Sequence, residues 1–152
     1  MASRIVLTIL IASSALLAQA QQPVASCKMP VEYENRNQVD PKRSSVSSIA
    51  GRVITEVGDP AREVGPWPAC LGLFTENDHR LVASAVADEE GHFKFSSVPT
   101  GSYRLVVRDP QNVFCAANMP LRVVRSLRGK AKSLVIHMRP SGIDDCSYGD
   151  FK

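Results

Sequence analysis

Three histidines are the residues of this chain best suited to acid–base or metal chemistry: His79, His92 and His137. His79 and His92 fall in successive turns of a predicted antiparallel fold, which places them at opposite ends of that fold. A metal site needs three or four ligands that converge at about 2 Å from the ion. We therefore expect solvated turn histidines and predict no metal centre.

An acidic run, Asp88-Glu89-Glu90, is the second group that could bind a cation. The run lacks the ligand spacing of a calcium loop, which favours a solvated acidic turn. The Gly-x-Ser-x-Gly elbow of serine hydrolases is also missing from the sequence. We therefore predict no catalytic residue and no cofactor, and we expect that the protein is not an enzyme.

Four cysteines, Cys27, Cys70, Cys115 and Cys146, carry the remaining reactive side chains. No two of them form a Cys-x-x-Cys pair, so neither a zinc knuckle nor a thioredoxin-type redox motif is supported. An even number of cysteines in an exported chain favours disulfides, of which three pairings are possible; buried thiols are the alternative.

Residues 1–20 have the features of a secretory signal. Arg4 precedes an uncharged apolar run over residues 5–17, and Ala18-Gln19-Ala20 forms a small-x-small cleavage site. The run is short for a transmembrane helix, and no later run is long enough to span a bilayer. We predict cleavage after Ala20, no membrane span, and a secreted or periplasmic protein.

A lipoprotein anchor at Cys27 is the alternative. Val24-Ala25-Ser26-Cys27 has the shape of a bacterial lipoprotein box, in which lipidation of the cysteine would tether the protein to a membrane. Such a box normally abuts the apolar run, whereas here a Gln-Gln-Pro segment intervenes.

Charge is uneven along the chain, although the net value is only +3. Between Arg104 and Arg139, Asp109 is the single acid among many basic residues. The basic cluster consists of Arg122, Arg125, Arg128, Lys130 and Lys132. It fits either an anionic partner, such as a lipid headgroup or an acidic glycan, or a solvated face that protects a sheet edge. Aromatic residues do not alternate with these charges, so we predict no nucleic-acid partner.

The mature chain divides into a polar extension (21–46), a segment rich in strands (47–140) and a polar tail (141–152). The candidate strands are 47–57, 68–76, 81–87, 92–97, 102–108, 119–125 and 132–139. Short strands separated by Gly, Pro, Asn and Asp, without helical periodicity, predict an all-β, seven-stranded antiparallel sandwich. Gly91 and Gly101 are placed at turns, where glycine tolerates a positive φ.

Alternation with a period of two identifies the side chains that face the core. The predicted inward set is Ile49, Val53, Ala69, Leu71, Leu73, Val82, Val86, Phe93, Phe95, Tyr103, Leu105, Val107, Leu121, Val123, Leu134, Ile136 and Met138. Ser133, Val135, His137 and Arg139 are predicted to face outward.

Over residues 47–140 the sequence resembles the carboxypeptidase regulatory-like domain, a transthyretin-like and starch-binding-like β-sandwich. The resemblance rests on Ile49-x-Gly51-x-Val53, Ala69-x-Leu71-x-Leu73, Asp88-x-x-Gly91-x-Phe93-x-Phe95 and Val98-Pro99-x-Gly101-x-Tyr103-x-Leu105. The connection over residues 56–68 is longer than in the family and carries Trp67. The chain also ends in Tyr148-Gly149-Asp150-Phe151-Lys152, unlike the Tyr-Arg-Gly-Ser end of related hydroxyisourate hydrolases.

The resemblance implies a non-catalytic structural or interaction module, commonly found beside other domains in exported bacterial proteins. Its partner would be an envelope protein or a glycan. The alternative function is a carbohydrate-binding module in which Trp67, between Pro66 and Pro68, stacks on a sugar; a cap over the end of the sandwich is the other role open to this residue.

The family's topology also implies a disulfide pairing. The second strand runs antiparallel to the strand that ends near Arg108, so the start of one lies near the end of the other. The loop that bears Cys115 begins there. The resemblance thus implies a Cys70–Cys115 bond, which leaves Cys27 to pair with Cys146.

Overall fold

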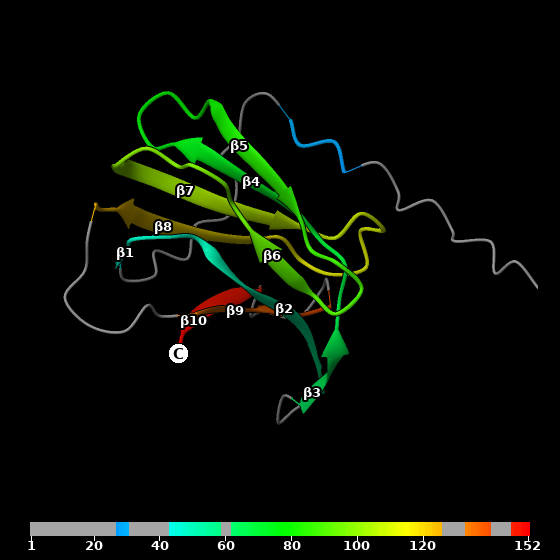
Figure 1. The fold of residues 1–152 in the computed structure, drawn as a ribbon. Helices are drawn as coiled ribbons and strands as arrows, with labels where there is room; N and C mark the ends of the chain where they lie inside the picture. Colours follow the sequence, from blue (N-terminus) through cyan, green and yellow to red (C-terminus); the bar gives the residue numbers. More distant parts are fainter. Residues whose placement is uncertain (1–26, 31–42, 59–61, 126–132, 141–146) are drawn as a thin grey trace, which may run out of the picture.

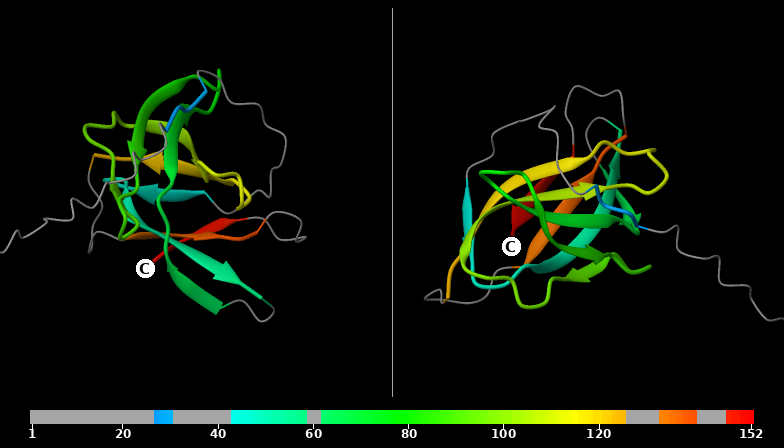
Figure 2. Two further views of the ribbon diagram at one scale, coloured as in Figure 1. Left: turned by 90° about the vertical axis from the view of Figure 1, so that its right-hand side faces the viewer. Right: turned by 90° about the horizontal axis from the view of Figure 1, so that it is seen from above.

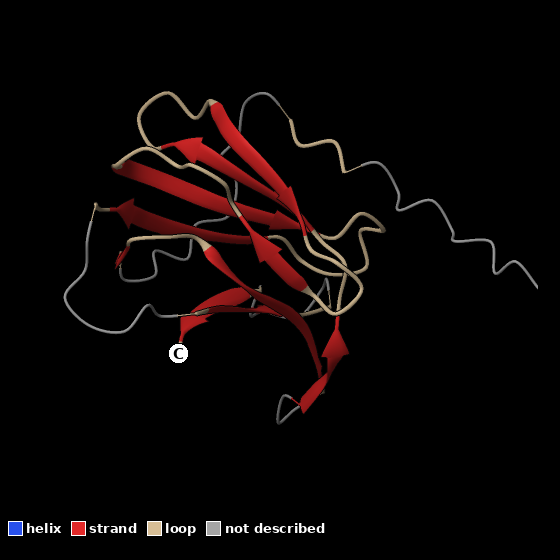
Figure 3. Cartoon of the chain, in the orientation of Figure 1, coloured by secondary structure: helices blue, strands red, loops and turns tan. Residues whose placement is uncertain are grey.

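The computed structural model describes residues 27–30, 43–58, 62–125, 133–140 and 147–152, and these residues form strands and loops without a helix (Figures 1 and 3). Two sheets lie face to face (Figure 2). The first has the order β1-β8-β7-β4-β5. Its strands are β1 (Ser44–Val46), β4 (Cys70–Thr75), β5 (Leu81–Val86), β7 (Gly101–Arg108) and β8 (Ala117–Val123).

The second sheet has the order β10-β9-β2-β3, and β6 also pairs with β2. Its strands are β2 (Ala50–Val57), β3 (Arg62–Pro66), β6 (His92–Lys94), β9 (Leu134–Met138) and β10 (Tyr148–Phe151). The all-β prediction is confirmed, but the described residues hold ten strands where the sequence predicts seven. Within the described part of the chain, no helix has the length and apolarity that a bilayer crossing requires.

The prediction of a purely antiparallel fold is wrong, because two strand pairs run parallel. β1 pairs with β8 in the first sheet, and β2 pairs with β9 in the second. Of the three passages from the first sheet to the second, β5 to β6 is one, and the other two lie between β1 and β2 and between β8 and β9. Since these last two passages run in the same sense, their starting strands, β1 and β8, lie side by side in parallel, and so do their end strands, β2 and β9.

The three strands that the sequence does not predict, β1, β3 and β10, all lie at sheet edges. An edge strand has one neighbour and an exposed side, so its residues need not follow the buried–exposed alternation of a central strand. β1 comes from the predicted extension and β10 from the predicted tail, so both polar flanks contribute to the sandwich.

The core lies between the sheets and contains the predicted inward side chains with two exceptions. Val82 and Val86 on β5 are 41% and 48% exposed, so the prediction that they face inward is wrong. Ala83 and Ala85 pack against the core instead. Their cross-strand partners are Leu73 and Leu71, which already fill that rim of the core, so the small side chains fit there.

Two glycines are required by the backbone itself. Gly91 has a φ of 79°, as predicted for a turn, and its carbonyl accepts a hydrogen bond from the N–H of Val53 at 2.8 Å. At Gly51 an added Cβ would lie 1.8 Å from the carbonyl oxygen of Leu134, so the close approach of β2 to β9 needs glycine. Gly101, in contrast, opens β7 without a positive φ.

Candidate functional site

The N-terminal segment 27–30 is bonded to the outer face of the first sheet. Cys27 forms a disulfide with Cys70 on β4, with the two Cα atoms 5.2 Å apart. The predicted Cys70–Cys115 and Cys27–Cys146 pairings are therefore wrong. The predicted strand arrangement is correct, because Cys70 at the start of β4 lies opposite Arg108 at the end of β7. Cys70 packs in a cluster separate from the main core.

The other two predicted disulfide residues lie toward the C-terminal part of the chain. Cys115 is half-buried, and its backbone N–H donates to the carbonyl of Arg139 at 2.8 Å. Cys146 lies outside the described residues. The next residue, Ser147, donates a hydrogen bond from Oγ to the carbonyl of Cys115 at 2.7 Å, which fixes the start of the C-terminal segment against the loop after β7.

A small apolar cluster forms under the disulfide-bonded segment. Met29 packs there with Cys70, Phe74 and Val106, on the face of the first sheet that is turned away from the main core. Gly72 provides the space, since a Cβ at this position would lie 2.6 Å from Cε of Met29. We call residues 27–30 with this disulfide and the Met29 contact the N-terminal clasp.

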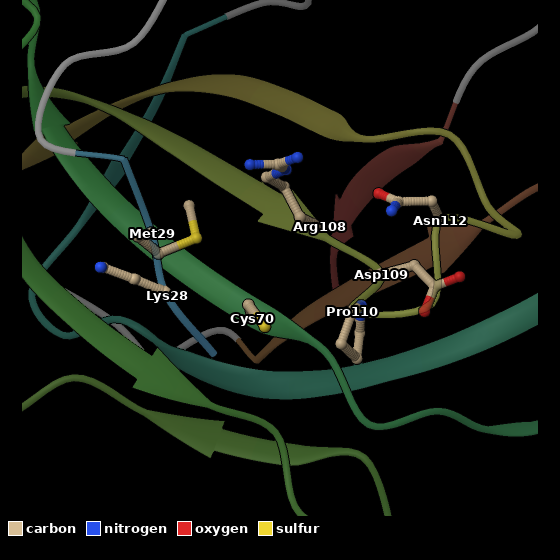
Figure 4. A pocket seen from close by; sticks show the side chains of 7 residues that line it. All are labelled: Lys28, Met29, Cys70, Arg108, Asp109, Pro110 and Asn112. Carbon is tan, nitrogen blue, oxygen red and sulfur yellow. The ribbon is translucent and has the colours of Figure 1, made fainter. Parts of the chain in front are cut away.

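A pocket of about 210 Å³ opens beside the clasp (Figure 4). Lys28 and Met29 come from the clasp, and Cys70 comes from β4. The other lining residues, Arg108, Asp109, Pro110 and Asn112, lie at the end of β7 and in the loop that follows it. Lys28 and Arg108 are exposed cations that can attract an anionic group, whereas the carboxylate of Asp109 opposes one.

Asp109 organises the loop that bounds this pocket. The side chain is 3% exposed and accepts four hydrogen bonds, from the backbone N–H groups of Gln111, Val113 and Phe114 and from the indole N–H of Trp67. Burial by itself would raise the pKa of this carboxyl, but the donated hydrogen bonds outweigh burial and hold the pKa below its usual value. The carboxylate therefore stays ionised and holds the loop through these backbone hydrogen bonds.

Trp67, the predicted sugar contact, is a half-buried part of this end of the sandwich. Its ring meets Phe114 edge to face, with the centroids 4.9 Å apart. Its Nε1 donates to Asp109 at 3.1 Å, and the side chain packs against the main core. These contacts match the role of a cap, in which the indole N–H is already used and one ring edge is covered.

A second polar cluster, which the sequence pattern does not predict, lies on the outer face of the second sheet. Nδ1 of His137 is 2.6 Å from Oε1 of Glu56, and Nε2 of His137 is 3.8 Å from Oδ2 of Asp150. The guanidinium of Arg139 and the hydroxyl of Tyr148 both reach Oε2 of Glu56, at 3.3 and 3.4 Å. The His137 and Tyr148 rings are stacked 4.5 Å apart.

Burial would raise the pKa of Glu56, but hydrogen bonds and electrostatic attraction from His137 and Arg139 outweigh burial and lower it. Burial and the Glu56 charge raise the pKa of Tyr148. A carboxylate beside an imidazole resembles a catalytic pair, but Nε2 of His137 is buried and forms no hydrogen bond with the described residues. The contacts of Glu56, His137, Arg139, Tyr148 and Asp150 with one another join β2, β9 and β10.

These residues were missed because their partners are distant in the sequence. His137 is predicted to face outward and does so, but it is 6% exposed because Glu56, eighty-one positions earlier, lies against it. The sequence feature that could have predicted this cluster is the placement of His137 and Arg139 on one face of a strand, with an acid on another strand.

The remaining candidate groups do not converge. His79 lies in the turn before β5, and His92 opens β6 with its backbone N–H bonded to Oδ1 of Asp88 at 2.6 Å. Within the described ranges, no three His, Cys, Asp or Glu side chains form a group that could hold a metal ion. Of the basic cluster, Arg122 and Arg125 line an open groove with Thr100 and Ser102, and Arg128, Lys130 and Lys132 lie outside the described residues.

Comparisons with known proteins agree with this architecture. Residues 47–137 match the family model described as "BOS complex subunit NOMO1-like, second beta sandwich domain". This is a sandwich of the transthyretin-like and carboxypeptidase regulatory-like kind, as the resemblance implied. No curated protein and no solved structure matches the chain significantly. The match covers β2 to β9 and more than half of the chain, so the protein belongs to the NOMO1-like second β-sandwich domain family.

Proposed function

We propose that this chain is a non-catalytic exported β-sandwich module that binds other protein chains in the cell envelope or outside the cell. The observation that carries the proposal is the exposure of valines on edge strands of both sheets. Val64 on β3 is 64% exposed, and Val82 and Val86 on β5 are 41% and 48% exposed. Exposed apolar side chains on edge strands are typical of surfaces that bind another chain.

The polar groups support a non-catalytic role. Glu56, His137 and Arg139 bind one another on the second sheet, and Asp109 binds Trp67 and its own loop. An acid–base catalyst needs a group within hydrogen-bond reach of a substrate. In the structure these groups instead form hydrogen bonds and ion pairs that hold strands and loops together.

Export is supported by the chain's first residues and by its disulfide. The apolar run and the Ala18-Gln19-Ala20 site favour a cleaved signal, although residues 1–26 lie outside the described residues. Disulfides persist in oxidising compartments such as the periplasm or the exterior. The Cys27 sulfur that bonds Cys70 is the one that a lipoprotein anchor would use, and one sulfur cannot carry both bonds. These observations favour a soluble exported form.

The matched family is described as a domain of a complex subunit, and this description belongs to the relatives from which the family model was built. For this chain it supports a role in protein assembly over a role in glycan binding. Carbohydrate binding through Trp67 is the alternative proposal. It requires a tryptophan face that is open to a sugar, whereas this ring is half-buried against Phe114.

Site-specific photo-crosslinking in the cells that produce the protein tests this proposal. A photoreactive amino acid is placed at Val64 on β3, at Val82 on β5, or, as a control, at the exposed Lys94 on β6. We expect crosslinked protein products from one or both edge positions and none from Lys94. Equal products from all three positions, or none from any of them, would contradict a protein-binding role for the edges.

A further inference from the structure

The outer edge of β5 is unlike the other sheet edges of this protein. β5 lies at the end of the first sheet and pairs only with β4 among the described strands. Its six residues, Leu81-Val82-Ala83-Ser84-Ala85-Val86, contain no charge, no proline and no glycine. Natural sheet edges are usually protected from pairing by charges, prolines or bulges.

The other edges carry such protection. β3 contains Arg62, Glu63 and Pro66, and a register shift interrupts its pairing with β2. β1 has only three residues, and β10 carries Gly149 and Asp150. β5 has a register shift too, but it lies near the start of the strand, opposite Leu73 and Phe74, and leaves the stretch from Ala83 to Val86 regular.

On this edge the backbone of β5 presents hydrogen-bonding groups that pair with none of the described strands. The N–H of Ala87 donates to the carbonyl of Ala69 at 2.9 Å, which makes that pair a hydrogen-bonded one. Hydrogen-bonded and non-hydrogen-bonded pairs alternate along an antiparallel ladder. Ala85 and Ala83 therefore direct their backbone groups toward β4, while Ser84 and Val86 direct theirs outward.

The residues from Val82 to Val86 read the same in both directions, as Val-Ala-Ser-Ala-Val. If two copies of β5 pair antiparallel about a two-fold axis at Ser84, each Val82 lies opposite the other copy's Val86. Each Ala83 then lies opposite an Ala85, and the two Ser84 residues face each other. The exposed valines would cover one another on the outer face, as cross-strand β-branched pairs do.

We infer that two copies of this chain associate through antiparallel pairing of their β5 strands, centred on Ser84, to join their first sheets into one continuous sheet. Twofold contacts use the same patch on both partners, and a palindromic, uncharged strand is complementary to itself in that arrangement. The inference deepens the proposed function, on which it rests, by naming the partner of the β5 edge.

The test measures the mass of the oxidised mature chain by sedimentation over a range of concentrations. We expect the wild-type chain to show a concentration-dependent dimer. Ser84→Lys places two like charges opposite each other and should raise the dimer dissociation constant by at least about tenfold. Ser84→Glu should do the same. A mixture of the two variants should dimerise again, because lysine then faces glutamate across the axis.

Ser84 is exposed, so each variant should keep the wild-type melting temperature at a concentration at which the wild-type chain is monomeric, and circular dichroism checks this. Val64→Lys on the β3 edge is the matched control and should leave the dimer intact. A wild-type chain that stays monomeric at every concentration would overturn the inference, as would unaffected dimers of both Ser84 variants or loss of the dimer in Val64→Lys. If the wild-type chain is monomeric but still crosslinks to a different protein at Val64 or Val82, self-pairing is refuted and the proposed function is retained.

Discussion

Trp67 and Asp109 show how single residues hold one end of this sandwich. The Asp109 carboxylate accepts hydrogen bonds from four N–H groups, three of which belong to the loop that follows it. The fourth comes from Trp67, whose ring rests on Phe114 and on the core. The indole thus ties the loop before β4 to the loop after β7.

Trp67→Ala should therefore lower the free energy of unfolding by about 2–4 kcal/mol, because it removes a large packed ring and leaves one Asp109 lone pair without its donor. Trp67→Phe keeps most of the ring packing and should lose only about 1 kcal/mol. Urea unfolding of the three proteins measures these differences. A Trp67→Ala protein of unchanged stability that loses retention on a polysaccharide column would instead assign the residue to a glycan site.

The N-terminal clasp is a short element that stabilises the fold from outside the region matched by the family model. The segment 27–30 forms no strand, yet it is held by the disulfide to β4 and by the burial of Met29 against Phe74 and Val106. The closed loop spans 43 positions and includes β1, β2 and β3. The disulfide therefore restricts the conformations of the unfolded chain over more than a quarter of the 152 residues.

Replacing Cys27 and Cys70 with serine should lower the free energy of unfolding by about 4 kcal/mol on the chain-entropy estimate for a loop of this size. The measurement compares urea unfolding of the double variant with that of the oxidised protein. A Met29→Ala variant keeps the disulfide and separates the packing contribution, which we expect to be about 2 kcal/mol. Non-reducing peptide mapping checks the bond itself, and recovery of a Cys27 peptide joined to any cysteine other than Cys70 would refute the clasp.

At the scale of the whole molecule, buried carboxylates link stability to pH. Glu56 joins the strands of the second sheet, and Asp109 holds the loop at the end of the first. Both have a pKa below the usual value in the folded protein. Burial alone would raise each pKa, but hydrogen bonds and, at Glu56, electrostatic attraction from His137 and Arg139 outweigh it. The unfolded chain therefore binds protons more readily than the folded chain when acid is added.

The stabilisation from a lowered carboxyl pKa is fully present above the usual pKa of about 4 and is lost as the pH falls toward the folded value. We expect the unfolding free energy to be flat from about pH 5 upward with respect to these two groups. Below about pH 4 it should fall by up to about 1.4 kcal/mol per pH unit for each group. Chemical denaturation between pH 2 and pH 7 measures this slope. Glu56→Gln and Asp109→Asn should each make the unfolding free energy fall less steeply at acid pH. An unchanged slope in both variants would show that other carboxyls control it.

The sequence by itself determined the sandwich and most of its core. Alternation over β4, β7 and β9 identified inward side chains correctly because a two-sided sheet constrains every second residue of a central strand. The glycine at position 91 marked a turn for a similar local reason, since few other residues accept its φ. Each of these features depends on neighbours within a few residues along the chain.

Tertiary structure alone decided the edges and the pairings between distant residues. β1, β3 and β10 depend on which strand lies beside them, and the parallel pairs depend on how the chain passes between sheets. The Cys27–Cys70 bond and the contact of Glu56 with His137 join residues far apart in sequence, and many pairings satisfy the same local pattern. On β5 the alternation was visible, but two faces of similar polarity competed, and the leucines already packed on β4 left space inside only for the alanines.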